Sequence, residues 1–371
     1  MTDRKDHTVV TVPLGDRSYP IHIGTDLLRR AGALIAEQCR SRAAVIVTDT
    51  AVAPLCLDAV RAGMVRSGFS VLSIVIPRGE RQKNPARASW IHAQMAERTL
   101  GRSTVVVALG GGVIGDLAGF VAATYMRGIE FVQVPTTLLA QVDSSVGGKV
   151  GVNLPQAKNL VGAFHQPTCV IADIGTLSTL PRRELVCGLG EVVKYGVILD
   201  RTFFSFVTGA VPQALRRDPE VLAAMVRRSC QLKAQVVSKD ERESGLRAIL
   251  NFGHTVGHAL EKAGGYSRLK HGEAVLYGML AETFIARNAG MLSPRHAAAV
   301  IDAVRLVPLP SLSRIAMNDR LLLTAMRSDK KSAAGAIRMV LPRRIGSVTL
   351  PRTVTPAAIV RALNELRRYD R

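Results

Sequence analysis

Residues 103–126 join an apolar segment, a glycine-rich turn and a second apolar segment without a break. The β-branched run 104–109 predicts a buried strand, and residues 117–124 are compatible with a helix. Between them, residues 110–115 fit the pattern G-x-G-x-x-G through Gly110, Gly112 and Gly115. A strand, a glycine loop and a helix in this order surround a phosphate with backbone N–H groups. Because triple glycines also form plain tight turns, the pattern alone leaves both readings open.

Polar residues follow the next predicted strand end. Residues 132–137 indicate a second strand end, and Asp143 and Lys149 follow in a segment rich in serine and glycine. Together they predict a crevice at the carboxyl edge of a parallel sheet. Asp49 and Glu80 also come just after predicted strands, where a carboxylate accepts hydrogen bonds from ribose hydroxyls. For each of these two acids, a solvated loop position is the alternative.

The order of the elements predicts two domains. A β-hairpin is expected over residues 8–23, and strands then alternate with helices, which predicts an α/β, Rossmann-like domain with a doubly wound parallel sheet over residues 1–178. Long amphipathic patterns follow, so residues 179–371 are expected to form a mostly α-helical domain. Within it, residues 336–341 and 347–350 form one expected late hairpin.

The composition excludes several classes of protein. The N-terminus is polar, and the longest apolar run contains glycines and Asp116, so neither a secretory signal nor a membrane span is expected. Five cysteines without a C-x-x-C spacing predict reduced thiols and a cytoplasmic location. The net charge is +20, but the arginines are scattered and aromatics make up only 4%. A solvated basic surface is therefore favoured over a nucleic-acid interface, and part of it can serve an acidic substrate.

The helical half carries candidate metal ligands. Glu191 lies in an apolar helical segment, where a carboxylate needs a partner, and an ion pair with Lys194 is the simpler interpretation. His254 and His258 are spaced i, i+4, as in zinc-binding helices, but the glutamate of a metalloprotease motif is missing. His271 adds a third imidazole. Three histidines within 18 positions, together with Glu191, favour a divalent metal site with nitrogen and oxygen ligands.

A set of cations accompanies these motifs. Each one alone is typical of a surface charge, but as a set converging on one cleft they suit a substrate with both phosphate and carboxylate groups. The set consists of Lys149, Lys158, Lys194, Lys233, Arg247, Lys330 and Arg127.

Taken together, these motifs closely resemble the 3-dehydroquinate synthase family of sugar-phosphate cyclases. The resemblance spans nearly the whole chain in the right order, which makes it far more specific than any single motif. The matching segments are 79–83, 110–120, 125–128, 133–141, 143–149, 158–164, 190–196, 243–258, 271–275 and 329–331.

The resemblance implies an NAD-binding N-terminal domain, a helical C-terminal domain with zinc or cobalt, and a homodimer. Glu191, His254 and His271 match the metal ligands, whereas His258 matches a site residue that is not a ligand. The positions that match NAD contacts are Arg78, Gly79, Glu80, Arg81, Gln82, Lys83, Gly112, Val113, Ile114, Gly115, Asp116, Thr136, Thr137, Lys149, Lys158, Thr176, Leu177, Ser178 and Thr179. Those that match catalytic and substrate-pocket positions are Arg127, from a neighbouring subunit, and Asp143, Lys149, Asn159, Lys194, Lys233, Glu243, Arg247, Asn251, His258 and Lys330.

The implied activity is the conversion of 3-deoxy-D-arabino-heptulosonate 7-phosphate to 3-dehydroquinate and phosphate, the second step of the shikimate pathway. It proceeds by transient oxidation by NAD, β-elimination of phosphate, re-reduction and an intramolecular aldol reaction, so NAD is not consumed. Two departures from the family pattern, Arg78 and the pair Leu276–Tyr277, leave this chemistry intact.

Three alternatives remain at this point. A sister sugar-phosphate cyclase shares the fold, NAD and metal, although Lys233, Arg247 and Asn251 favour a carboxylated substrate. A metal-dependent polyol dehydrogenase would release NADH steadily, and the phosphate-binding cations speak against it. A basic nucleic-acid-binding protein lacks the expected aromatic or lysine-rich platform.

Overall fold

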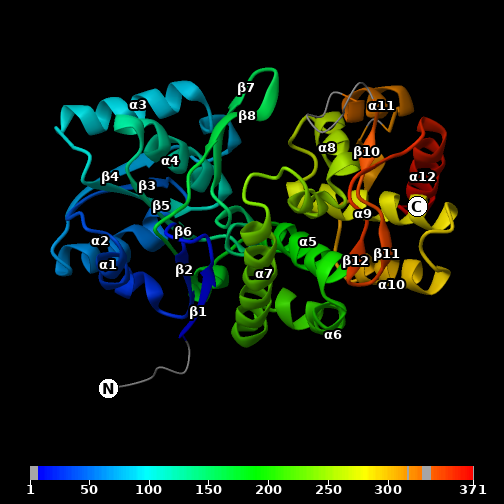
Figure 1. Cartoon of the computed structure of the whole chain (residues 1–371), viewed down its shortest axis with the longest axis horizontal. Coiled ribbons are helices and arrows are strands. Elements are labelled where there is room, and N and C mark those ends of the chain that lie inside the picture. The colour runs from blue at the N-terminus through cyan, green and yellow to red at the C-terminus, as the bar shows by residue number, and fades with distance from the viewer. Residues whose placement is uncertain (1–6, 316, 328–335, 371) are drawn as a thin grey trace. The chain divides into compact units, whose positions relative to one another are not determined.

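The computed structural model describes residues 7–315, 317–327 and 336–370. These residues form two compact units. Unit 1 comprises the described residues up to Leu180 together with Leu222–Ser238. Unit 2 comprises Pro181–Val221 and the described residues from Lys239 onward. Figure 1 labels the main elements of both units.

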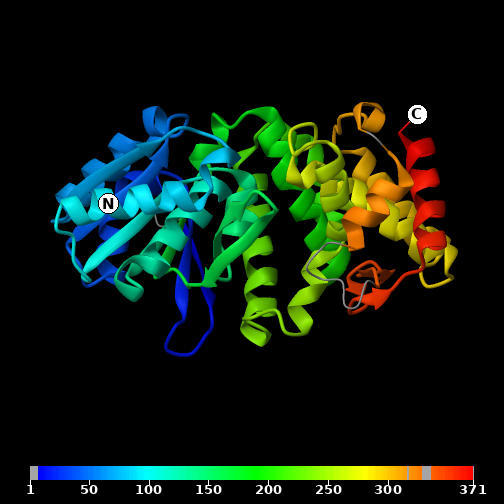
Figure 2. The same cartoon turned by 90° about the horizontal axis from the view of Figure 1, so that it is seen from above.

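Unit 1 contains a seven-stranded sheet in the order β1-β2-β9-β6-β5-β3-β4. Every neighbouring pair is parallel except β1 and β2, which form the expected hairpin. The hairpin reaches out from its unit in Figure 2. The mostly parallel sheet predicted from the alternating elements is therefore confirmed. Its strands are β1 (His7–Val12), β2 (Tyr19–Gly24), β3 (Ala43–Asp49), β4 (Ser70–Ile76), β5 (Thr104–Gly110), β6 (Glu130–Pro135) and β9 (Cys169–Asp173).

Helices cover both faces of this sheet (Figure 1). Successive residues of the central strand β5 face opposite sides, so Val106 packs in the core under α3 and α4 and Val107 in the core under α1 and α2. Because both faces of the sheet are covered, the sequence of β5 is nearly continuously apolar. The covering helices are α1 (Leu27–Gln38), α2 (Asp58–Arg66), α3 (Pro85–Glu97) and α4 (Gly112–Thr124).

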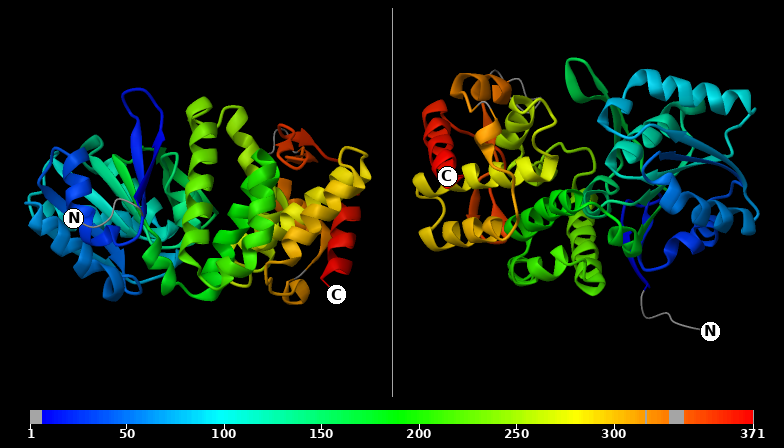
Figure 3. Two further views of the ribbon diagram at one scale, coloured as in Figure 1. Left: turned by 90° about the horizontal axis from the view of Figure 1, so that it is seen from below. Right: turned by 180° about the vertical axis from the view of Figure 1, so that it is seen from behind.

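Beyond the sheet, unit 1 carries a separate antiparallel ribbon of β7 (Lys149–Leu154) and β8 (Ala157–Phe164). The ribbon stands clear of the sheet in the right-hand view of Figure 3. Lys149 thus begins a strand outside the main sheet. Short helical turns complete the unit: η2 (Ala53–Leu57), η3 (Glu80–Gln82), η4 (Tyr125–Arg127), η5 (Ala140–Ser144) and η6 (Ile174–Ser178).

Unit 2 is built around α9 (His271–Asn288), in which every residue from Gly272 to Ala286 is buried. A helix that is buried on all sides needs neighbours all round, and α5, α8, α10 and α12 pack against it. The helical C-terminal region is as predicted. The remaining helices are α5 (Arg182–Leu199), α6 (Arg201–Leu215), α7 (Pro219–Lys239, of which Leu222–Ser238 belong to unit 1), η7 (Leu246–Asn251), α8 (His254–Ala263), α10 (Pro294–Arg305), η8 (Leu312–Arg314), α11 (Asp319–Arg327) and α12 (Pro356–Tyr369).

The expected late hairpin is present. Its two arms pair from Arg344 with Ser347 out to Arg338 with Thr353, and Gly346 takes the left-handed conformation at the turn. Its strands are β10 (Arg338–Met339), β11 (Pro342–Arg344), β12 (Ser347–Val348) and β13 (Arg352–Thr353). Among the helices of the described residues, none is long and apolar enough to cross a membrane.

Helix α9 touches its neighbours backbone to backbone at glycines. A Cβ atom on Gly272 would lie 1.8 Å from the carbonyl oxygen of Cys187 in α5, and one on Gly190 would lie 2.5 Å from that of Gly272. A Cβ atom on Gly278 would likewise lie 1.8 Å from the carbonyl oxygen of Gly253, just before α8. These positions exclude every side chain, since backbone atoms cannot move aside.

This packing yields a paired stability prediction. Gly272→Ala should lower the free energy of unfolding by about 3 kcal/mol or more, because the methyl group forces α5 and α9 apart. Gly209→Ala is the matched control: it lies within α6 and its Cβ would meet nothing within 4 Å, so a gain of roughly 0.5–1 kcal/mol is expected. Thermal unfolding followed by circular dichroism checks both, and an unchanged midpoint for Gly272→Ala would contradict the packing argument.

Candidate active site

Three side chains converge in unit 2. Glu191 comes from the middle of α5, and His254 and His271 are the first residues of α8 and α9. The Nε2 atoms of both histidines lie 3.6 Å from Oε1 of Glu191. The side chain of Glu191 is 0% exposed, so its charge has no contact with solvent. The three candidate metal ligands named from the sequence therefore lie together.

The second nitrogen of each ring defines the tautomer. Nδ1 of His254 lies 3.1 Å from the carbonyl oxygen of Phe252, and Nδ1 of His271 lies 3.1 Å from Oε2 of Glu261. Because a carbonyl or carboxylate oxygen only accepts, the hydrogen-bond network places the proton of each ring on Nδ1. Nε2 of both rings therefore faces Glu191, where a cation would bind in place of any proton on Nε2.

The predicted ion pair between Glu191 and Lys194 is also present, and it involves Oε2 of Glu191. Oε1, which faces the two histidines, accepts no hydrogen bond from any described residue. In a tetrahedral site with bonds of about 2.1 Å, neighbouring ligand atoms are roughly 3.4 Å apart, close to the observed separations. The ion pair with Lys194 thus accounts for Oε2 of Glu191. Oε1 and the two histidine Nε2 atoms fit a divalent metal such as zinc or cobalt.

The electrostatics of the centre favour positive charge. Burial alone would lower the pKa of His271, but the nearby carboxylates of Glu191 and Glu261 outweigh it and raise the pKa to about 10. His258 lies beside the centre, with its ring centroid 5.4 Å from that of His254 and 5.9 Å from that of His271. It also forms a second possible ligand cluster with Glu261 and His271. The role of His258 as a site residue stays a prediction.

The glycine loop of unit 1 adopts the expected strand–loop–helix form. Strand β5 ends at Gly110, α4 begins at Gly112, and the first amide to bond within the helix is that of Gly115, to Gly111. The preceding amides at the helix N-terminus remain available for an anion. A Cβ atom on Gly115 would lie 2.7 Å from Oε1 of Gln133, so this glycine allows the helix to pack on β6. The loop thus fits a nucleotide phosphate.

The predicted NAD segment 78–83 is tied to the β7–β8 ribbon. The buried Nζ of Lys83 lies 2.5 Å from both Oδ2 of Asp116 and Oδ1 of Asn159. Asn153 Nδ2 donates to Oε1 of Glu80 at 2.6 Å. Three predicted site residues therefore form one polar cluster, in which Lys83 links Asp116 to Asn159.

Other predicted positions of unit 1 lie at strand ends. Thr136 directly follows β6, and its buried hydroxyl has no hydrogen-bond partner among the described residues. Thr176 donates to the carbonyl oxygen of Asp173 within η6, and its hydroxyl also accepts from Gln141. Thr137, Leu177, Ser178 and Thr179 occupy the same two chain turns, while Lys149 and Lys158 lie on the β7–β8 ribbon.

Lys233 is brought to unit 1 by α7, although it lies far along the chain. Its Nζ donates to the carbonyl oxygen of Asp143 at 2.6 Å and to Oδ1 of the same residue at 2.7 Å. Two predicted substrate-pocket residues separated by 90 positions thus form a partly buried ion pair. Arg127 is exposed, has a φ of 67° and borders a hollow with Arg102 and His165.

The loop before η7 gathers further predicted residues of unit 2. Asn251 Nδ2 donates to Oε1 of Glu243 at 2.7 Å, and the buried Arg247 donates to the carbonyl oxygen of Glu241. Asp240 holds the loop by accepting from the amides of Ser244, Gly245 and Arg247. The predicted residue Lys330 lies outside the described residues.

The comparisons with known proteins cover both units. The family model for the 3-dehydroquinate synthase N-terminal region matches residues 73–187, and the model for the C-terminal region matches residues 188–332. A 3-dehydroquinate synthase of Symbiobacterium thermophilum is 50% identical over 96% of this chain and 99% of its own length. One of Desulforamulus reducens is 45% identical over 96% of this chain and 99% of its own length.

The chain belongs to the 3-dehydroquinate synthase family. It is an enzyme with 3-dehydroquinate synthase activity, as the resemblance implied. The identity to the relatives is 45–50%, well above that to sister cyclases.

The solved structures support the same fold. A 2-deoxy-scyllo-inosose synthase with carbaglucose-6-phosphate, NAD+ and Co2+ has a TM-score of 0.87 at 25% identity and covers 96% of this chain and 99% of its own. A 2-epi-5-epi-valiolone synthase from Streptomyces hygroscopicus with NAD+ and Zn2+ has a TM-score of 0.86 at 28% identity, covering 95% of this chain and 97% of its own. A probable glycerol dehydrogenase from Sinorhizobium meliloti, at 14% identity and a TM-score of 0.65, shares the fold alone.

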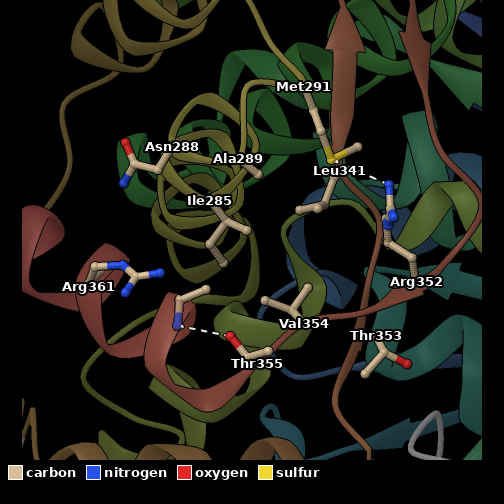
Figure 4. Close-up of a pocket in the computed structure, with 11 residues that line it drawn as sticks. Ile285, Asn288, Ala289, Met291, Leu341, Arg352, Thr353, Val354, Thr355 and Arg361 are labelled. Atoms are coloured by element: carbon tan, nitrogen blue, oxygen red, sulfur yellow. Dashed lines mark hydrogen bonds between the residues drawn. The ribbon is translucent and has the colours of Figure 1, made fainter.

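A separate hollow of about 420 Å³ in unit 2 is lined by none of the predicted site residues (Figure 4). It lies where the end of α9, near Ile285, faces the start of α12. Figure 4 shows Thr355, which caps α12, accepting from the backbone of Ala358.

Sequence reasoning missed Glu261 and Asp240. Glu261 lies on α8, and its sequence signal is an acid three residues after His258, on the helix face that also carries His254. Asp240 looks like an ordinary acid after a helix. Their roles follow only from the structure, which places one against a histidine and the other inside a loop.

Metal removal should destabilise unit 2. Treatment with a chelator is expected to lower the melting temperature, and Zn2+ or Co2+ at 100 times its dissociation constant should restore about 2.7 kcal/mol. In His254→Ala the metal should restore far less, because one of three ligands is missing. His296→Ala, on α10 and in neither ligand cluster, is the control and should respond like the wild type. Equal melting temperatures with and without metal would contradict the site.

Asp240 should give a pH-dependent contribution to stability. Burial would raise its pKa, but hydrogen bonds from the amides of Arg247, Ser244 and Gly245 outweigh this and lower it to about 2. The contribution is therefore present above the ordinary pKa of about 3.9 and is lost as the pH falls toward 2. The free energies of unfolding of Asp240→Asn and the wild type, measured with urea, should differ most above about pH 4. A difference that stays constant down to pH 2.5, roughly, would refute the assignment.

Proposed function

We propose that the chain binds NAD at the glycine loop of unit 1 and a divalent zinc or cobalt ion at Glu191, His254 and His271, and uses both in its synthase activity. The observation that carries the metal part is the buried Oε1 of Glu191, faced by two Nε2 atoms at 3.6 Å. The residues proposed to contact NAD are those of 78–83, 112–116, 136–137 and 176–179, with Lys149 and Lys158. This corresponds to an NAD-binding domain at 1–178 and a metal- and substrate-binding domain at 179–371.

When bound, NAD supplies a hydride acceptor that is regenerated within the turnover, and the divalent cation supplies a Lewis acid that acidifies a substrate hydroxyl. The chain's own residues bind and orient the substrate. Lys194 neutralises part of the Glu191 carboxylate, and the direction of Nε2 in both histidines is held by Phe252 and Glu261. This fixed arrangement needs little reorganisation when the substrate arrives.

The cations are proposed to hold the two anionic ends of the heptulosonate phosphate. Arg247 is buried and already oriented by the loop that Asp240 closes, which suits a planar carboxylate. Three lysines suit phosphate oxygens: Lys149, Lys158 and Lys233, the last of which is held by Asp143. Asn159, Glu243, Asn251, His258 and Lys330 complete the proposed set. Arg127 is proposed to come from a neighbouring subunit, which implies a homodimer.

A coupled assay tests the function directly. Metal-loaded protein with NAD and 3-deoxy-D-arabino-heptulosonate 7-phosphate should release one phosphate per substrate without net NADH, because the hydride is returned. Phosphate release and NADH absorbance are followed together. Lys233→Met should lower kcat/KM at least tenfold, since one charge-assisted contact is worth about 1.5–3 kcal/mol.

The other outcomes discriminate the alternatives. Accumulating NADH without phosphate would refute the cyclase mechanism and favour a dehydrogenase. No signal with this substrate, but turnover of the sugar phosphates used by sister cyclases, would move the chain to another branch of the superfamily.

A further inference from the structure

Glu282 is a fully buried acid of α9 that the site described above does not use. Its side chain is 0% exposed, and it lies eleven residues after His271 on the same helix. Oε2 of Glu282 accepts the backbone N–H of Gly253 at 2.7 Å. Burying a carboxyl group is costly, so a position that retains one has a specific task in the surrounding structure.

The peptide group that Glu282 contacts also contacts a metal ligand. The N–H of Gly253 and the C=O of Phe252 belong to one planar peptide unit. That carbonyl oxygen accepts from Nδ1 of His254, at 3.1 Å. A continuous chain of hydrogen bonds therefore runs from Glu282 through the peptide to His254, whose Nε2 faces Glu191.

The turn that carries this peptide has little freedom. Gly253 has a φ of 80°, and a Cβ there would lie 2.6 Å from both Cγ of Met279 and the carbonyl oxygen of Val275. The turn is therefore pressed against the part of α9 that precedes Glu282. With its N–H end held by the carboxyl group, the peptide plane fixes the direction of its carbonyl and so of the His254 ring.

We propose that Glu282 is a positioning residue of the metal centre, which acts on His254 through the Phe252–Gly253 peptide. It is the counterpart of Glu261, which contacts His271 directly. Both imidazoles are thus backed by a carboxyl group, one directly and one across a peptide. A negative charge at the far end of such a chain polarises the peptide and makes the imidazole a stronger ligand.

This inference rests on the proposed metal site, so the wild type is measured first. Its affinity for Co2+ is determined by competition with a chelator, together with the visible absorption of the bound cobalt. If the wild type binds no cobalt, or if His254→Ala binds it equally well, the proposed metal site fails and this inference fails with it. If the wild type binds and His254→Ala does not, Glu282 can be judged by itself.

The test variant is Glu282→Gln, which keeps an oxygen for the Gly253 N–H but removes the charge. We expect about 10- to 100-fold weaker Co2+ binding and a shifted cobalt spectrum, with a metal-free melting temperature near that of the wild type. Thr283→Val is the matched control, because Thr283 is the next residue of α9, is also 0% exposed and has no hydrogen-bond partner for its hydroxyl among the described residues. It should bind Co2+ like the wild type.

A purely structural role for Glu282 predicts a different result. It would lower the metal-free melting temperature and leave Co2+ affinity and spectrum unchanged, which would overturn the proposal. If Glu282→Gln does not fold, Glu282→Asp serves as the second variant, since it keeps the charge but shortens the side chain by one methylene. The proposal then requires a changed cobalt spectrum, and a wild-type spectrum would refute it.

Discussion

Backbone contact between helices is the constraint on which the metal centre depends. Each proposed ligand stands next to a glycine that touches another helix or its flanking turn: Gly190 precedes Glu191, Gly253 precedes His254, and Gly272 follows His271. At all three, a Cβ atom would come within 2.6 Å of a backbone oxygen of a neighbouring element. The ligands therefore converge because their main chains meet, and little is left to side-chain freedom. Such closeness also explains why α9 is buried on all sides, since it must receive α5 and α8 at once.

The same packing holds groups that a stable core alone would avoid. Glu191 and Lys194 are 0% and 1% exposed, and a buried ion pair of this kind rarely adds stability over apolar residues of the same size. Glu282 adds a further acid within the same helices. Carboxyl groups that are buried together destabilise the fold unless each one has a hydrogen-bond donor or a cation as its partner. The hydrogen bonds from His271 and from the Gly253 amide supply partners for Glu261 and Glu282, and a cation completes the set at Glu191.

The sequence predicted what depends on residue type and local order. Strand β5, the glycine loop and α4 follow from an apolar run broken at Gly110, and histidines with an acid in apolar helices predict a metal site. The choice of His271 over His258 as a ligand came only from the family resemblance. What it could not predict depends on contacts between distant positions. Lys233 contacts Asp143, 90 residues away in the sequence, because part of α7 belongs to unit 1. The hydrophobic periodicity of α7 does not indicate which unit the helix packs against. The β7–β8 ribbon was not predicted, because residues 143–149 were expected to lie at the carboxyl edge of the parallel sheet. Glu261, Asp240 and Glu282 carry only the signal of an acid in a helix or loop, and their partners are backbone amides or a ring nitrogen.

The charges around the ligands explain what the centre can do. If a cation replaced any proton on Nε2, both imidazoles would be neutral, and the charged groups around them would include the carboxylates of Glu191 and Glu261 and the ammonium of Lys194. Together they carry one negative charge, so a divalent cation would leave the group with one positive charge. That surplus would favour loss of a proton from a substrate hydroxyl, whereas a second protein carboxylate on the cation would cancel it. Placing Glu282 behind a peptide therefore serves two needs at once: it orients His254, and it keeps its own oxygens away from the cation.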